Sequence, residues 1–98
     1  MAKKLPPLHP GEILLEDFLK PLGISQNKVG LAIGMPAPSI NAIVNGRRSI
    51  TPETALRLGR YLKTGPEVWL NLQHEYDLRI ARRKLEKELK RIEPLVGS

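Results

Sequence analysis

The sequence contains no cysteine, few aromatic residues and no long hydrophobic run. Without cysteine, disulfides, thiolate catalysis and cysteine-ligated metals are excluded. Aromatic residues make up 4% of the chain and hydrophobic residues 41%, so we expect an aliphatic core. No apolar stretch approaches the roughly 18 residues of a membrane span, and the N-terminus lacks the apolar segment of a signal peptide. We therefore expect a cytoplasmic protein with no membrane partner.

Patterns typical of enzymes are also missing. His9 and His74 are far apart and lack a metal-ligand spacing, and there is no glycine-rich phosphate loop. Ser25, Ser39 and Ser49 are better explained as a helix cap, a groove contact and a loop residue than as nucleophiles. We expect no catalytic residue, metal, cofactor or small-molecule substrate.

The charge of the chain favours an anionic partner, because the net charge is +6 and the pI is near 10.0. Residues 79–93 hold seven Lys and Arg against three Glu, a net of +4, which leaves +2 for the rest. The basic pI is thus weak support for DNA binding by itself.

The hydrophobic pattern is helical throughout, and no useful stretch alternates with the period of a strand. Caps, prolines and first-turn acids mark five helix starts. The first four helices are expected to start at Pro10, at Gln26 after the N-cap Ser25, at about Pro36, and at Pro52 after Thr51. The fifth is expected to start at a capping box formed by Thr64 and Glu67. We expect an all-α fold, with the first helix ended by Pro21 and Gly23 and the third by Asn45 and Gly46.

Residues 26–45 have the layout of a helix-turn-helix motif. Val29 and Ile33 form one apolar stripe, and Gly30 beside them lets a second helix come close. Gly34 is suited to the left-handed conformation that ends a helix. Ile40 and Ile43 supply the second apolar stripe. In such a motif the second helix lies in the DNA major groove.

The outward positions of this second helix carry short side chains that suit base edges. They are Ala37, Pro38, Ser39, Asn41, Ala42 and Asn45. Phosphate contacts are expected from Gln26, Asn45, Arg47 and Arg48. A helix pair with a central glycine also occurs in ordinary helix packing, but such packing does not require a small polar face followed by two arginines.

The sequence pattern of residues 78–92 indicates a contact with protein. A narrow apolar stripe runs along an otherwise charged helix and consists of Leu78, Ala81, Leu85, Leu89 and Ile92. Three interpretations are open for this helix. It extends the fifth helix and reinforces a dimer, it folds back onto its own domain, or it binds another protein. Its basic side is also compatible with DNA. Trp69, Leu72 and Tyr76, with Leu78 and Leu85, are the candidate dimer residues, although Trp69 suits a core equally.

Five segments resemble the HigA family of antitoxins, which are VapI-like members of the Xre/Cro helix-turn-helix class. The segments are His9–Glu16, Leu22–Gln26, Ile43–Arg48, Ile50–Leu58 and Pro66–Gln73. The resemblance implies a five-helix, phage-repressor-like domain over residues 9–78, after a flexible lead-in at 1–8 and before a charged amphipathic helical extension at 79–98. One departure is Gly30, where the wider class more often has alanine.

The resemblance also implies a function. HigA-type proteins are homodimers that bind a palindromic operator, repress their own operon and neutralise a RelE-like toxin, HigB, which cleaves mRNA. The acids Glu12, Glu16 and Asp17 are candidates for the toxin contact, the alternative being a solvated helix face. Two other functions stay open: a solitary transcriptional regulator without a toxin, and a toxin-binding module that no longer binds DNA.

Overall fold

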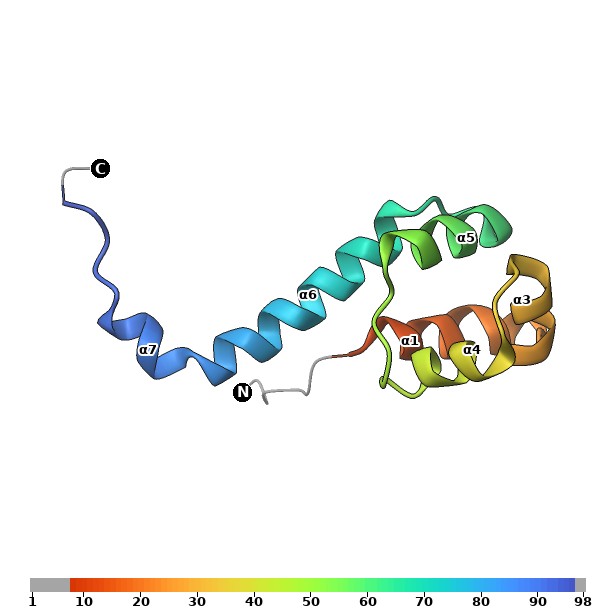
Figure 1. The fold of residues 1–98 in the computed structure, drawn as a ribbon, viewed down its shortest axis with the longest axis horizontal. Helices are drawn as coiled ribbons and strands as arrows, with labels where there is room; N and C mark the ends of the chain where they lie inside the picture. The colour runs from red at the N-terminus through yellow and green to blue at the C-terminus, as the bar shows by residue number, and fades with distance from the viewer. Residues whose placement is uncertain (1–7, 97–98) are drawn as a thin grey trace.

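The structure, a computed structural model, describes residues 8–96, and every regular element within them is helical (Figure 1). This confirms the expected all-α fold. The lead-in expected at the N-terminus falls, apart from Leu8, outside the described residues. The elements are α1 (Pro10–Ile13), η1 (Leu14–Leu19), α2 (Lys20–Leu22), α3 (Gln26–Ile33), α4 (Ala37–Val44), α5 (Pro52–Leu62), α6 (Glu67–Lys84) and α7 (Glu86–Arg91).

The first three elements follow one another without a break, because η1 is a π-helical segment between two α-helical ends. His9 caps the start, where its Nδ1 accepts a hydrogen bond from the Gly11 N–H at 2.9 Å. The expectation that Pro21 ends this helix was wrong. In the π-helical segment the Lys20 N–H donates to the Leu15 carbonyl, five residues earlier. This turn is wider than an α-helical turn, so the backbone carbonyl that would clash with the Pro21 ring is displaced and the helix continues past Pro21. The helix ends at Gly23 alone, which has a left-handed φ of 66°.

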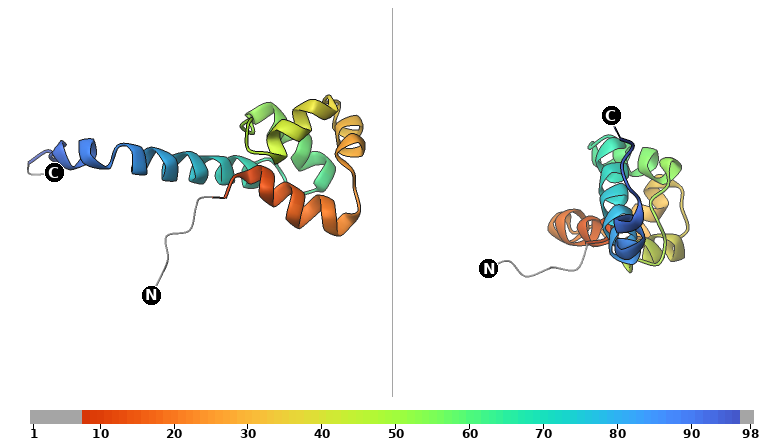
Figure 2. Two further views of the ribbon diagram at one scale, coloured as in Figure 1. Left: turned by 90° about the horizontal axis from the view of Figure 1, so that it is seen from below. Right: turned by 90° about the vertical axis from the view of Figure 1, so that its left-hand side faces the viewer.

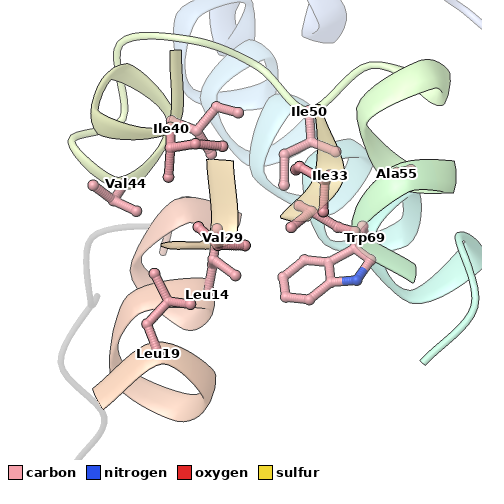
Figure 3. Close-up of a cluster of buried hydrophobic side chains, with 11 residues drawn as sticks. Leu14, Leu19, Val29, Ile33, Ile40, Val44, Ile50, Ala55 and Trp69 are labelled. Carbon is pink, nitrogen blue, oxygen red and sulfur yellow. The ribbon is translucent and has the colours of Figure 1, made fainter. Parts of the chain in front are cut away.

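The core lies where α3, α4, α5 and the start of α6 meet the first helix (Figure 3). Its fully buried members are mostly aliphatic, as expected, and they surround one indole ring. The largest are Trp69, Leu14, Leu19, Ile40, Ile43, Leu58 and Val29. Packing is closest where α1 crosses α4, because a Cβ on Gly11 would overlap the Ile43 carbonyl. This contact fixes α4 against the first helix.

The start of α6 differs from the predicted capping box. The Thr64 hydroxyl accepts a hydrogen bond from the Trp69 indole N–H at 2.9 Å, and the N-cap position is Pro66, which makes no side-chain cap bond. The hydroxyl is directed to the indole, and Thr64 is not the N-cap of α6. Trp69 itself is 0% exposed and packs at 5.3 Å, ring centre to ring centre, from Phe18. Trp69 is therefore a core residue, and its assignment to a dimer surface was wrong.

The C-terminal part of α6 leaves the bundle and forms an arm together with α7 (Figures 1 and 2). The chain bends at Leu85, between α6 and α7, and residues 77–96 are all exposed. The radius of gyration is 16.7 Å, larger than the ~13 Å of a compact domain of about 100 residues. The extension thus continues the fifth helix, as expected, and does not fold back. The boundary expected after residue 78 falls inside α6.

Crossing a membrane requires a longer or more apolar helix than any found between residues 8 and 96.

Candidate nucleic-acid interface

Helix α3 is capped at both ends, and its C-terminal cap begins the elbow to α4. Ser25 Oγ accepts from the Lys28 N–H at 3.0 Å and starts α3. Gly34, with φ at 75°, ends it in the left-handed conformation. The Arg57 guanidinium donates to the Ile33 carbonyl at 2.7 Å, so a side chain from α5 satisfies the C-terminus of α3. This role of Arg57 was not predicted from the sequence, because its partner, the Ile33 carbonyl, lies 24 residues away along the chain.

Gly30 allows the two helices of the motif to approach closely. A Cβ at this position would lie 2.7 Å from the Met35 carbonyl oxygen and 3.5 Å from Ile40 Cγ1. A backbone carbonyl cannot move aside as a flexible side chain can. Glycine at this position is therefore matched to the tight turn of this chain, in spite of its poorer helix propensity.

All the residues expected to face DNA reach the surface, on α4, at the start of α3 or in the loop after α4, while Ile40, Ile43 and Val44 turn inward and are buried. We call this surface the recognition face. Its exposed members are Pro38, Asn41, Asn45, Arg47 and Arg48, and its half-buried members are Gln26, Ala37, Ser39 and Ala42. The structure thus brings together every residue that was assigned to this surface.

Hydrogen bonds connect the polar members of the recognition face. Asn41 Nδ2 donates to Gln26 Oε1 at 3.1 Å, which links α4 to the start of α3. Asn45 Nδ2 donates to Asn41 Oδ1 at 3.1 Å, and Arg47 Nη2 approaches the same oxygen at 3.4 Å. The Arg48 guanidinium donates to Ser39 Oγ at 2.8 Å. The side chains are thereby held in place without DNA.

The two arginines give the recognition face its positive charge. Within residues 8–96, neither Arg47 nor Arg48 forms a salt bridge with an acid. Both contact only neutral oxygens of α4 and keep donors free. An unpaired guanidinium is suited to a phosphate oxygen, which it can meet in a bidentate geometry.

Apart from the buried Trp69, the remaining candidates lie on three other surfaces. Glu12, Glu16 and Asp17 are exposed on the first helix, and Glu16 pairs with Lys20 at 2.8 Å. Leu72 and Tyr76 are half-buried and line a hollow between α1 and α6 that Leu8 and Ile13 also line. Leu78 and Leu85 are exposed on the arm.

The candidate dimer residues do not share one face of α6. At 100° per residue, Leu72 and Tyr76 lie beside the buried Trp69, whereas Leu78 and Leu85 lie on the opposite side of the helix. We call Leu78, Ala81, Leu85, Leu89 and Ile92 the arm stripe; all five are exposed. One flat surface of a partner therefore cannot cover both the arm stripe and the hollow at Leu72 and Tyr76.

The tight elbow between α3 and α4, in an all-helical bundle that presents α4 at the surface, places the protein in the class of helix-turn-helix proteins. A profile of the helix-turn-helix family matches residues 15–69. Virulence-associated protein I of Dichelobacter nodosus is 46% identical over 78 residues, which cover 80% of this chain and 72% of that protein. Antitoxin HigA-1 of Vibrio cholerae is 35% identical over 92 residues, or 94% of this chain and 87% of that one.

Among solved structures, Pseudomonas aeruginosa antitoxin HigA with the higBA promoter is 43% identical, with a TM-score of 0.88. The match covers 92% of this chain and 99% of that chain. The chain belongs to the helix-turn-helix family and, within it, to the HigA antitoxins.

Proposed function

We propose that the protein is a transcriptional repressor that binds a palindromic operator before its own operon and is also the antitoxin of a type II toxin–antitoxin system. The observation that carries the proposal is the recognition face. Its preformed polar side chains and the unpaired arginines of the loop after α4 surround a helix that is free to enter a major groove. The related HigA from Pseudomonas aeruginosa, solved with the higBA promoter, supports DNA as the ligand.

A palindromic operator requires a symmetric pair of recognition faces, so the protein acts as a homodimer. The arm stripe is an apolar surface on a charged helix and is the surface we assign to this contact. Leu72 and Tyr76, which border the hollow beneath the arm, are a second candidate surface for the same dimer.

The toxin partner is a RelE/HigB-like protein that cleaves mRNA. A protein that binds RNA carries basic residues, so the exposed acids Glu12, Glu16 and Asp17 have the complementary charge. They lie on the first helix, and the recognition face lies on α3, α4 and the loop that follows. In this proposal the protein is not an enzyme, and it acts in the cytoplasm, where a bacterial operator is found.

Footprinting on the DNA upstream of the gene, with and without the product of the neighbouring gene, tests the proposal. We expect a protected palindrome with the protein alone, and inhibition of the neighbouring product's mRNA cleavage when the two are mixed. Neutralisation without a footprint would instead identify a toxin-binding module that no longer binds DNA. A footprint with no toxin gene beside it would identify a solitary regulator.

A further inference from the structure

The side-chain amide of Asn41 is hydrogen-bonded at both ends. Its nitrogen donates to Gln26 Oε1 at 3.1 Å. Its oxygen accepts from Asn45 Nδ2 at 3.1 Å and from Arg47 Nη2 at 3.4 Å. An amide oxygen has two lone pairs, so both are in use.

The backbone determines the direction of these bonds. Asn45 Nδ2 also donates to the backbone carbonyl of Asn41 at 3.0 Å, and a carbonyl can only accept. The Asn45 nitrogen therefore faces Asn41, which must present its oxygen in return. Arg47 has donors only and requires the same orientation. The Asn41 nitrogen is then left to face Gln26, which accepts through its oxygen.

This orientation limits what Asn41 can offer to DNA. Across the described chain, residues 8–96, its Nδ2 has one protein acceptor, so one N–H remains free. An asparagine that reads adenine accepts from N6 and donates to N7 at the same time. With its oxygen occupied, Asn41 cannot accept from N6. Guanine has an acceptor, O6, where adenine has the N6 donor, and O6 needs a donor only; N7 is an acceptor in both purines and does not separate them.

We propose that Asn41 selects a guanine in the operator half-site by donating its free N–H to O6, and that Gln26 is the positioning residue that holds the amide in this orientation. The inference rests on the proposed function, since it needs α4 in the major groove. The chemistry recognised is a hydrogen-bond acceptor, which a phosphate oxygen also provides. Base preference separates the two, because a phosphate contact carries no sequence information.

The test uses the full chain and the operator found by footprinting. Each base pair of one half-site is replaced in turn by the other three, and binding is measured by fluorescence anisotropy at one salt concentration. For the wild-type protein we expect a position where guanine is preferred over adenine by roughly tenfold. Replacing that guanine by 7-deazaguanine, which lacks N7 and keeps O6, should leave binding nearly unchanged, as should the minor-groove control inosine–cytosine.

Asn41→Asp removes the donor and keeps an oxygen for Asn45 and Arg47. We expect this variant to lose the guanine preference at that position. Gln26→Glu is the matched control, because it adds the same charge nearby and still offers an oxygen to the Asn41 nitrogen. It should weaken all duplexes and keep the preference. Gln26→Leu, which has no such oxygen, should relax the preference without adding charge.

Circular dichroism verifies the fold of each variant; Asn41 is exposed, Gln26 is half-buried, and neither belongs to the hydrophobic core. The inference is overturned if Asn41→Asp weakens every duplex by one factor with an unchanged base profile, which would place Asn41 on a phosphate. It is also overturned if the wild type prefers adenine at the position that Asn41→Asp affects. If the wild type binds no duplex, the proposed function fails together with this inference.

Discussion

The side-chain oxygen of Gln73 accepts a hydrogen bond from the backbone N–H of Ile50 at 2.8 Å, in the interior of the protein. The other end of the Gln73 amide donates to Asp77 at 3.0 Å. The loop that carries Arg47 and Arg48 is thereby tied to α6, the helix that continues into the arm. One buried amide thus connects the loop of the recognition face to the helix that leads to the arm stripe.

Replacing Gln73 should destabilise the protein, because Gln73→Ala leaves the buried Ile50 N–H without an acceptor. An unsatisfied buried donor costs about 1–3 kcal/mol. We expect the free energy of unfolding in urea to fall by this amount. Asn71→Ala, on an exposed position of the same helix, is the control and should change it little. Equal effects of the two substitutions would show that the Gln73 bond does not anchor the loop.

The close crossing of α1 over α4 should make the stability of the protein sensitive to any side chain at Gly11. An alanine favours a helix over glycine by up to about 1 kcal/mol, but at Gly11 its Cβ would overlap the Ile43 carbonyl. Overpacking of this kind costs about 1–3 kcal/mol, and a backbone neighbour places Gly11→Ala at the upper end. Gly30→Ala, where the nearest atom is 2.7 Å away, should cost less. Thermal unfolding of both variants checks the order; a Gly11→Ala protein as stable as the wild type would refute the close crossing.

Stability should fall in mildly acidic solution because of His9. Burial lowers the pKa of His9 below 6.5, although the nearby carboxylates of Asp77 and Glu12 act in the opposite direction. The unfolded chain therefore binds a proton more readily than the folded one, and stability decreases as the pH falls from 6.5 toward the folded pKa. Below that pKa the contribution is constant.

Urea unfolding as a function of pH checks this effect of His9. His9→Asn can still cap the helix and does not titrate, so its stability should lack the decrease. His74→Asn, at an exposed site, should retain it. A wild-type profile without the decrease would mean that His9 protonates equally well in the folded state.

The arm stripe is predicted to form the dimer, and Leu85→Asp places a charge in its centre. Leu85 is 44% exposed in the single chain, so the substitution should leave the fold of the domain intact. We expect sedimentation equilibrium to show a dimer weakened by at least tenfold. Lys87→Asp, which changes more charge on another side of the arm, should weaken it less. A dimer unaffected by Leu85→Asp would move the contact to the hollow at Leu72 and Tyr76.

Much of the motif could be predicted from the sequence because its signals are local. The Ser25 cap, the left-handed Gly34 and the outward position of Asn41 depend on neighbours within a few residues along the chain, and all three are found in the structure. Capping chemistry and helical periodicity are sufficient to place them. The same periodicity predicted that the arm would be helical.

What could not be predicted depends on contacts between distant segments. Trp69 has the same apolar signal whether a core or a second subunit covers it, and only packing against Phe18 shows which. Thr64 matched a capping pattern, but the indole uses its hydroxyl. Gln73 has no apolar signal, although it lies four residues after Trp69 on the same buried side of α6. Its partner, Ile50, is far away in the sequence.

The most direct test of the central claim is the salt dependence of operator binding by the wild type and by Arg47→Ala/Arg48→Ala. Each phosphate contact contributes about 0.9 to the slope of log K against log salt concentration. We predict weaker binding and a slope reduced by about two for each protomer, because we propose a phosphate contact for each arginine. Arg79→Ala/Arg82→Ala removes the same charge from the arm and should keep the slope. Two equal slopes for the wild type and the Arg47/Arg48 variant would contradict the account.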